Sequence, residues 1–283
     1  MNDYASDLVE KITKDSKTSF YYTFLFLGKE QRDAMNTIYS FCRISDDIVD
    51  DELPTDVKEK NLLEWEKDLK ETEANNPKDP YFEKINTILK EFNIPYSHLF
   101  GLIKGMRMDL LQSSYPTFSD LRDYCYHAAS VVGLMCIEIF GYTNKQAIEY
   151  AENLGIALQL TNIIRDVHAD TLINRYYIPD EDFASFNYSK EELKNGIYNA
   201  NFVEMMKFQS ARAHEYYQKA SELLPKTDKK TLLVSEMMHK IYFRLLQKIE
   251  TGNFMVMNQK VSLKSSQKLG IASKEFIKSK LSF

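Results

Sequence analysis

Apolar residues recur along this chain at the spacing of an α-helix, and no segment shows the alternation of a β-strand. Between residues 28 and 50 the apolar stripe is formed by Ala34, Ile38, Phe41 and Ile48. A longer stripe runs through residues 144–168. Its members are Ile148, Ala151, Leu154, Leu158 and Ile163. Each apolar face must be covered by other helices, so the pattern predicts an all-α bundle without a sheet.

Short segments rich in Pro, Asn, Asp and Ser separate the periodic stretches. Pro54 ends the first helix, because proline lacks a backbone donor, and Ser119 is the expected N-cap of a later one. The predicted helices span residues 28–50, 56–73, 81–92, 95–112, 120–140, 144–168, 189–196, 201–224 and 228–251. The sequence contains no repeat, low-complexity tract or flexible linker, so we expect a single domain over residues 1–283.

Composition narrows the class of protein. The net charge of −5 and the pI near 5.7 argue against a nucleic-acid-binding protein. The three cysteines, Cys42, Cys125 and Cys136, form no CxxC pair and are typical of buried thiols in a reducing compartment. The first residues are polar, and no apolar run reaches the ~18 residues of a membrane span. We therefore expect a cytoplasmic protein.

Aromatic side chains make up 13% of the chain, with 18 Tyr and 17 Phe. Rings of this kind usually pack in a hydrophobic core. They can also line a cavity, where their faces stabilise a positive charge. Both interpretations stay open at this point.

The C-terminal tail, residues 260–283, differs in charge from the rest of the chain because it holds six Lys and one Glu. Apolar residues are interleaved with these lysines. One interpretation is a solvated terminal helix. The other is a peripheral membrane contact, because basic amphipathic segments bind anionic lipid surfaces.

The first candidate site is the acidic end of the predicted helix 28–50, which reads CRISDDIVDD. Asp46 and Asp50 are four residues apart, so their carboxylates project from the same helical face, as do those of Asp47 and Asp51. Like charges at this spacing repel, and the helix C-terminus disfavours anions. The segment is therefore either a solvated helix end or a cation site.

A second acidic segment repeats the spacing in LTNIIRDVHAD. Asn162, Asp166 and Asp170 lie four residues apart on one face, and Gln159 precedes them by one turn. Oxygen ligands of this kind suit Mg²⁺, which proteins hold with few carboxylates and with substrate phosphates. The five histidines show no zinc spacing.

Arginines accompany both segments. Arg43 precedes Asp46, Arg165 precedes Asp166, and Arg175 follows in the next loop. Guanidinium groups bind phosphate oxygens in a bidentate manner. Carboxylates and arginines together predict a site for a metal-bound diphosphate.

At these residues the chain resembles the squalene/phytoene synthase family over nearly its whole length. The resemblance is carried by six blocks, SKTSFYYTFLFL (16–27), IYSFCRISDDIVDD (38–51), GMRMDL (105–110), YCYHAASVVGLM (124–135), LGIALQLTNIIRDVHAD (154–170) and RYYIP (175–179). It implies an all-α, single-domain bundle around a central cavity, in which Mg²⁺ assists the head-to-head condensation of two identical prenyl diphosphates.

The resemblance also implies roles for individual residues. Metal binding falls on Asp46, Asp50, Asn162, Asp166 and Asp170. Diphosphate and substrate contacts fall on Ser19, Arg43, Gln159, Arg165 and Arg175. The catalytic positions are Tyr124 and Tyr177, close to the reacting carbons, together with Arg165. Three residues depart from the family pattern, namely Ser130, His168 and Ala169, and the last removes one carboxylate from the second segment.

Several functions remain as alternatives. The stretch IEIFGY (137–142) looks closest to bacterial presqualene diphosphate synthases, which join two farnesyl diphosphates. Phytoene synthase, which uses two geranylgeranyl diphosphates, is the main competitor. NADPH would be needed only if the reaction proceeded to squalene. A head-to-tail prenyltransferase and a non-catalytic assembly factor are weaker alternatives, and the sequence leaves the oligomeric state open.

Overall fold

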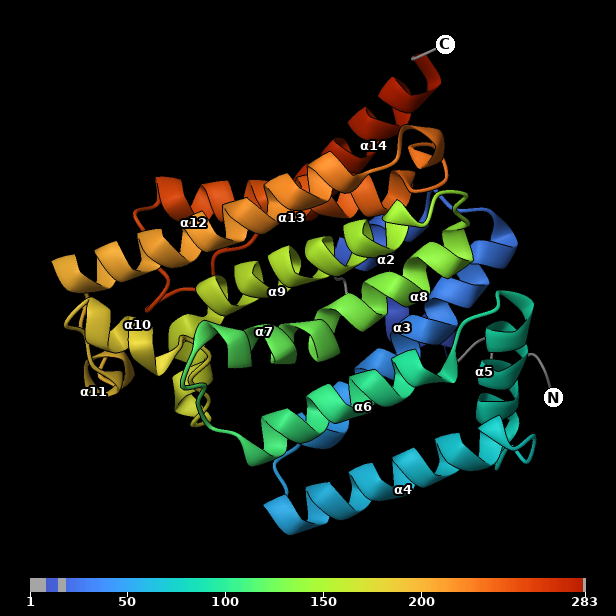
Figure 1. The fold of residues 1–283 in the computed structure, drawn as a ribbon, viewed down its shortest axis with the longest axis horizontal. Coiled ribbons are helices and arrows are strands. Elements are labelled where there is room, and N and C mark those ends of the chain that lie inside the picture. The colour runs from blue at the N-terminus through green and yellow to red at the C-terminus, as the bar shows by residue number, and fades with distance from the viewer. Residues whose placement is uncertain (1–8, 15–18, 282–283) are drawn as a thin grey trace.

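The computed structural model describes residues 9–14 and 19–281, and these residues form helices joined by short loops (Figure 1). The named elements are α2 (Ser19–Phe24), α3 (Lys29–Asp50), α4 (Thr55–Glu73), α5 (Pro80–Glu91), α6 (Tyr96–Leu111), α7 (Phe118–Cys125), the π-helix η1 (Tyr126–Ser130), α8 (Val131–Phe140), α9 (Gln146–Leu172), α10 (Asp180–Ser185), α11 (Lys190–Lys194), α12 (Ala200–Leu223), the 3₁₀-helix η2 (Lys226–Asp228), α13 (Leu233–Thr251) and α14 (Ser265–Leu281). Within these ranges the only β-pairing is an isolated bridge between Ser114 and Tyr176. The predicted all-α fold is confirmed.

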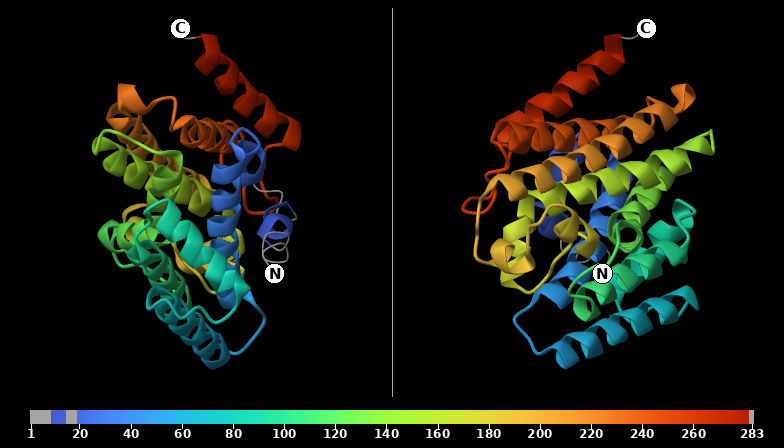
Figure 2. Two further views of the ribbon diagram at one scale, coloured as in Figure 1. Left: turned by 90° about the vertical axis from the view of Figure 1, so that its right-hand side faces the viewer. Right: turned by 60° about the vertical axis from the view of Figure 1, so that its left-hand side comes forward.

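Helix α9 is the central element of the bundle. It packs against α12 and α13 on one side and against α8 and η1 on the other, with α3, α6 and α4 forming further layers (Figures 1 and 2). One hydrophobic core runs from Val9 to Ala272. Because α9 is covered by other layers, Gln159, Asn162 and Asp166 in its C-terminal half are partly buried, whereas Gln146 and Glu149 at its start are exposed.

Two helix boundaries differ from the prediction in ways that affect the site. Helix α9 was expected to end at residue 168, but it continues to Leu172 and so carries Asp170 on the same helix as Asn162 and Asp166. The segment predicted as one helix over 120–140 contains the π-helix η1 between α7 and α8. Ser119 is not the N-cap of α7. Thr117 takes that position through a reciprocal capping box with Asp120.

The π-helix lies in unusually close contact with α9. A Cβ atom on Gly155 would come within 2.6 Å of Ser130 Cα, and one on Gly133 would come within 2.9 Å of the Ala151 carbonyl oxygen. Glycine at these positions therefore allows η1 and α8 to approach α9. Ser130 fits this tight contact because its hydroxyl donates to the Glu152 carbonyl at 2.7 Å.

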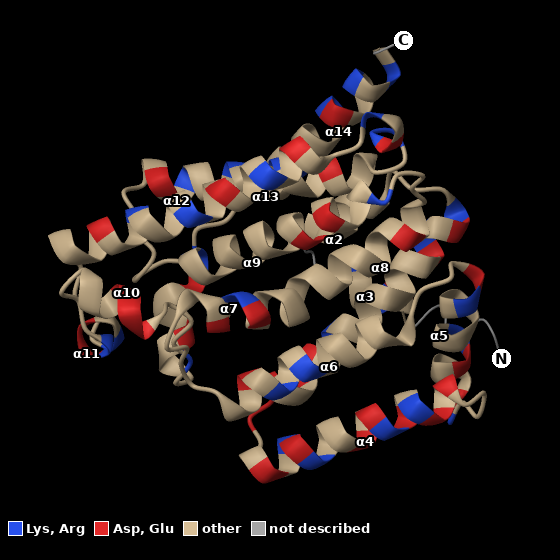
Figure 3. Ribbon diagram, in the orientation of Figure 1, with Lys and Arg blue, Asp and Glu red and all other residues tan. Residues whose placement is uncertain are grey.

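The C-terminal tail is not a fully solvated helix. Helix α14 packs against α13 and α2, with Ala272 fully buried and the Phe276 ring 5.2 Å from that of Phe26. Tyr22 Oη also donates to Ser265 Oγ at 2.6 Å. The opposite face of α14 is exposed and carries most of its lysines (Figure 3). In the described ranges, no helix combines the length and the apolar character needed to cross a bilayer.

Candidate active site

A cavity of about 490 Å³ lies between α3, α8, α9 and α13. Its charged end, called the mouth below, is lined by Ser19, Arg43, Asp46, Gln159, Asn162, Arg165, Lys260 and Lys268. The rest of the wall is mainly apolar or aromatic and includes Phe24, Leu102, Val132, Phe140, Leu154, Leu158, Met238 and Ile241. A polar mouth that opens into an apolar interior suits a ligand with a charged head and a hydrocarbon tail.

The first acidic segment reaches the mouth from the C-terminal end of α3. Burial raises the pKa of Asp46 to about 7, and the negative charge of Asp50 adds to the effect. Asp47 faces outward and pairs with Arg43 at 2.5 Å. Asp46 is therefore the member of this segment whose charge is least compensated, which favours binding of a cation.

The second acidic segment comes from the C-terminal half of α9. Burial raises the pKa of Asp170 to about 7, with Asp166 as the next cause. Asp166 accepts two hydrogen bonds from Arg165, one from Nε at 2.9 Å and a shorter one from Nη2. Burial therefore raises the pKa of a carboxylate in each of the two segments, Asp46 in the first and Asp170 in the second.

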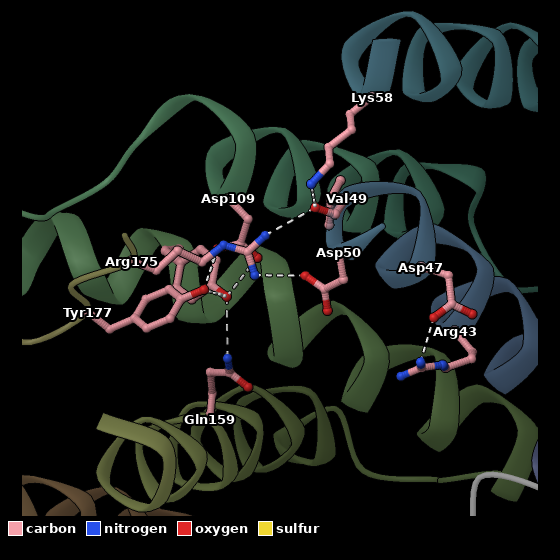
Figure 4. Close-up of polar contacts among 10 residues, drawn as sticks. Arg43, Asp47, Val49, Asp50, Lys58, Asp109, Gln159, Arg175 and Tyr177 are labelled. Atoms are coloured by element: carbon pink, nitrogen blue, oxygen red, sulfur yellow. Dashed lines mark hydrogen bonds and ion pairs between the residues drawn. The ribbon is translucent and has the colours of Figure 1, made fainter. Parts of the chain in front are cut away.

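A third carboxylate, that of Asp109 on α6, joins the two segments. Tyr177 Oη donates to its Oδ1 at 2.7 Å, and Tyr124 Oη donates to its Oδ2 at 3.0 Å (Figure 4). Burial raises the pKa of Asp109 to about 6 although both hydrogen bonds oppose the shift. The charge of Asp109 in turn raises the pKa values of Asp46 and Asp170. Asp109 therefore lies between the acidic segments and orients both tyrosines.

The two predicted catalytic tyrosines form a stacked pair. The rings of Tyr124 and Tyr177 lie 5.1 Å apart at 24°, and Tyr115 stacks on Tyr177 at 6.1 Å. Burial, followed by the charge of Asp109, raises the pKa values of Tyr124 and Tyr177 well above the ordinary value. Gln159 Nε2 donates to Tyr124 Oη at 3.5 Å. Both phenols are therefore neutral hydrogen-bond donors near neutral pH.

Arg175 connects the loop after α9 to the end of α3. Its Nη1 donates to Asp50 Oδ1 at 2.8 Å, and its Nη2 to the Val49 carbonyl at 3.4 Å (Figure 4). Lys58 donates to the same carbonyl at 3.0 Å. The arginine thus fixes the distance between the two acidic segments as well as adding positive charge.

The basic tail contributes to the mouth. Lys260 lies 3.7 Å from Asp166 Oδ1, and both Lys260 and Lys268 line the cavity. Burial lowers the pKa of Lys268, and the positive charge of Arg165 lowers it further. An anion placed between these cations would relieve their repulsion.

The residues at the mouth fit a magnesium ion shared with a substrate. In the described part of the chain, no three acidic, His or Cys side chains converge closely enough to enclose a metal by themselves. Asn162 Oδ1 is buried and accepts no hydrogen bond from any described residue, while its Nδ2 donates to Gln159 at 3.4 Å. A buried amide oxygen without a hydrogen bond, close to carboxylates whose charge is not neutralised by a nearby cation, suits Mg²⁺. This ion commonly takes its remaining ligands from phosphate and water.

The two departures in the second segment lie in different surroundings. His168 Nδ1 contacts the Leu193 carbonyl at 2.9 Å, toward α11. Ala169 follows Asn162 by seven residues and therefore lies on the same side of α9, but it is exposed to solvent and is not among the residues that line the cavity. An acid at position 169 would therefore lie on the side of Asn162 and Asp166, at the solvent-exposed end of α9.

Of the site residues predicted from the sequence, six line the cavity, namely Ser19, Arg43, Asp46, Gln159, Asn162 and Arg165. The other six, Asp50, Asp166, Asp170, Arg175, Tyr124 and Tyr177, are not among its lining residues. Four further residues at or near the site had no role assigned to them from the sequence. Asp109 was inside the GMRMDL block, and an acid within an apolar helix was the available signal. Lys260 and Lys268 were assigned only to a charged tail, and Tyr242, which lines the cavity from α13, carried no signal. Of the block 16–27, residues 16–18 lie outside the described residues, whereas Ser19 lines the mouth as expected.

Comparisons with known proteins identify the family. The family model for squalene/phytoene synthase matches residues 13–267. A 15-cis-phytoene synthase of Synechococcus elongatus is 33% identical over 92% of this chain and 88% of its own length. A phytoene synthase of Mycobacterium tuberculosis is 29% identical over 96% of this chain and 90% of its own.

Solved structures share the fold. A dehydrosqualene synthase in complex with a ligand superposes with a TM-score of 0.89 at 25% identity, over 99% of this chain and 98% of that one. A squalene synthase of Alicyclobacillus acidocaldarius superposes with a TM-score of 0.80 at 22% identity, over 89% and 95% of the two chains. The chain belongs to the squalene/phytoene synthase family.

Proposed function

We propose that this protein catalyses the Mg²⁺-dependent head-to-head condensation of two prenyl diphosphates. The observation that supports it most directly is the cavity, in which a mouth of carboxylates, arginines and lysines opens into an apolar interior. A prenyl diphosphate has the matching division between a charged head and a hydrocarbon tail. The family assignment also speaks against the head-to-tail alternative, and the retained carboxylates speak against a non-catalytic relative.

Asp46, Asp50, Asn162, Asp166 and Asp170 would hold the metal. When bound, Mg²⁺ supplies Lewis-acid stabilisation of the diphosphate leaving group. Arg43, Arg165, Lys260 and Lys268 line the same cavity and would take the remaining diphosphate oxygens, as would Arg175, which pairs with Asp50. Ser19, which lines the cavity at α2, adds a hydroxyl donor there.

Departure of diphosphate from the first substrate leaves an allylic cation, and the 2,3 double bond of the second substrate attacks it. The cavity wall excludes water, which would otherwise quench the cation. Aromatic side chains that line the cavity, among them Phe24 and Phe140, can stabilise positive charge without acting as nucleophiles.

Loss of one proton then closes a cyclopropane ring. Tyr124 is held in its neutral form, so it can pass a proton only if it receives one in return. The Asp109 carboxylate, with a pKa of about 6, is the nearest acceptor of such a proton, and released diphosphate is the other.

For the substrate we favour two farnesyl diphosphates, giving presqualene diphosphate. The similarity to a dehydrosqualene synthase structure supports this choice. The second candidate is phytoene synthesis from two geranylgeranyl diphosphates, which the names of the sequence relatives favour. Reduction to squalene would require NADPH as a second cofactor.

The test is incubation with Mg²⁺ and each of the two diphosphates, with and without NADPH, followed by product analysis. A C30 cyclopropyl diphosphate supports the leading proposal, and C40 phytoene supports the second candidate. Absence of diphosphate release from either substrate would overturn both.

We also propose that α14 contacts an anionic membrane, since the product is lipophilic. Its exposed face carries Leu269, Ile277 and Leu281, which are 41%, 56% and 76% exposed, flanked by Lys274 and Lys280. Apolar residues flanked by lysines are typical of interfacial helices. Co-sedimentation with vesicles should require anionic lipid and weaken in Ile277→Glu. Equal binding to neutral vesicles, or no change in this variant, would overturn the membrane proposal alone.

A further inference from the structure

The cavity follows helix α9 for a long distance. Arg165 lines its mouth, and Tyr150 lines it from the first turns of the same helix. At about 1.5 Å of rise per residue, these two residues are separated by about 22 Å along the helix axis. The cavity is therefore long and has two chemically different ends.

The end opposite the mouth, called the floor below, is formed where α8, α9 and α13 meet. Gly133 of α8 lies against Ala151, the neighbour of Tyr150. Val234 and Ser235, from the first turn of α13, line the cavity there, as does Phe140 at the end of α8. Tyr150 is the largest polar-tipped side chain among them.

The ring of Tyr150 is fixed in place. It is fully buried, and its hydroxyl donates to Glu236 Oε1 at 2.9 Å. The same oxygen lies 3.3 Å from Nδ1 of His239, which is also buried. Although burial raises the pKa of Glu236, His239 and the Tyr150 hydroxyl hold it below its ordinary value. Glu236 is thus a charged acceptor that anchors the tyrosine to α13.

An anchored ring stops a hydrocarbon chain in a way that a flexible side chain does not. A chain long enough to pass it would have to displace the ring, which breaks the hydrogen bond and leaves the Glu236 carboxylate with one partner fewer in an apolar region. A shorter chain ends against the ring face and leaves this bond intact.

We propose that Tyr150, held by Glu236, is the floor of the prenyl cavity and sets the longest isoprenoid chain that the protein accepts. This inference rests on the proposed function, since it assumes that the cavity holds prenyl tails. It assigns Tyr150 a role in substrate selection and none in the chemical step.

The principal test compares Tyr150→Ala with Tyr150→Phe in a competition between C15 and C20 diphosphates. Removing the ring should raise the ratio of C40 to C30 products by about 10-fold or more, the scale on which apolar pockets discriminate chain length. Tyr150→Phe keeps the ring and should leave the ratio close to wild type. Tyr188→Ala is the matched control, because Tyr188 is buried, bonded through its hydroxyl to the Ile197 carbonyl at 2.7 Å, and absent from the cavity wall.

A second variant guards against loss of folding in Tyr150→Ala. Val234→Phe narrows the floor from α13 and should lower the same ratio. The relative affinities of unreactive C15 and C20 thiodiphosphates, measured by calorimetry, give a readout that does not depend on turnover. They should shift in opposite directions in the two variants.

The outcomes separate the two proposals. If the wild type converts neither diphosphate, the proposed function fails. If the wild type is active but neither Tyr150→Ala nor Val234→Phe changes chain-length preference more than Tyr188→Ala does, the floor assignment is wrong and the proposed function stands.

Discussion

The mouth and the floor of the cavity lie at different ends of the same helix, α9, yet they are stabilised in opposite ways. At the mouth, burial holds the pKa values of Asp46 and Asp170 near 7, so their charges are costly in the folded protein. At the floor, the single carboxylate, Glu236, has a hydrogen-bond donor and a histidine beside it. Charge is therefore left uncompensated at one end and is compensated at the other.

This difference has a functional reason. Folded proteins retain a destabilised group where binding or catalysis requires it, and the rest of the fold must compensate. A ligand that brings metal and diphosphate to the mouth would neutralise the carboxylates and the lysines together. The floor needs no uncompensated charge, because it only stops a hydrocarbon chain. A side chain held rigidly by a hydrogen bond serves that purpose.

The largest effect should come from the mouth. Asp46→Asn and Asp166→Asn should each lower turnover at least ~100-fold, the scale of losing an electrostatic catalytic group. Steady-state kinetics with purified variants measures the change. Asp51→Asn is the control, because Asp51 is an exposed acid at the same helix end. Activity near that of wild type in both mouth variants would contradict the metal assignment.

Asp109→Asn should have the next largest effect. The two tyrosines donate to different oxygens of Asp109, and the amide replaces one of these oxygens with an NH₂ donor, so one tyrosine loses its acceptor. We expect a loss of about 10- to 100-fold in kcat, similar to that of other groups that orient site residues, with little change in KM. Tyr115→Phe is the control, since no hydrogen bond to the Tyr115 hydroxyl is found among the described residues. A fall confined to KM would show that Asp109 acts on binding instead.

The sequence could point to the two acidic segments because the evidence for them is local. Asp46 and Asp50, like Asn162, Asp166 and Asp170, are four residues apart, and a helix converts that spacing directly into a shared face. Asp109 could not be placed in the same way, because its role depends on how α6 packs relative to both acidic segments. Its tyrosine partners come from α7 and from the loop after α9.

The floor could not be predicted from the sequence. Tyr150 is one of 18 tyrosines, and its spacing matches that of any buried residue of α9. Its role depends on Glu236, which is 86 residues away in the chain. The fold class could be predicted from the sequence, because apolar periodicity is also a local pattern. The π-helix η1 could not be predicted, since it depends on close packing against Gly155 of α9.

A thermal-stability experiment sharpens the comparison between the two ends. The pKa values of Asp46 and Asp170 in the folded protein are about 7, above the ordinary value of about 4 for an unfolded chain. Between about pH 4 and pH 7 the folded state therefore binds more protons, and stability falls as the pH rises through this window. Without added Mg²⁺, we expect Tm to rise as the pH is lowered from about 8 to about 5.5.

A substitution at the mouth and one at the floor should change the free energy of unfolding in opposite directions. Asp46→Asn removes a costly charge and should raise Tm at pH 7.5 while flattening the pH dependence. Tyr150→Phe removes a hydrogen bond to a buried acceptor and should cost about 1 kcal/mol of unfolding free energy. Calorimetry at several pH values measures both. Destabilisation by Asp46→Asn at pH 7.5 would mean that the charge at the mouth is already compensated.

The smallest effect is expected at position 169, where the family pattern has an acid and this chain has Ala169. The residue lies on the same side of α9 as Asn162, but it is exposed and does not line the cavity, so an added carboxylate there would be screened by solvent. Ala169→Asp should change turnover and the Mg²⁺ concentration for half-maximal activity by less than about 5-fold, since exposed charges contribute at most about 1 kcal/mol. A titration with Mg²⁺ at fixed substrate measures both quantities. A much larger gain in apparent Mg²⁺ affinity would show that the mouth extends along α9 beyond Asp166, to the exposed end of the helix. The contrast with the floor would then be one of size as well as of charge.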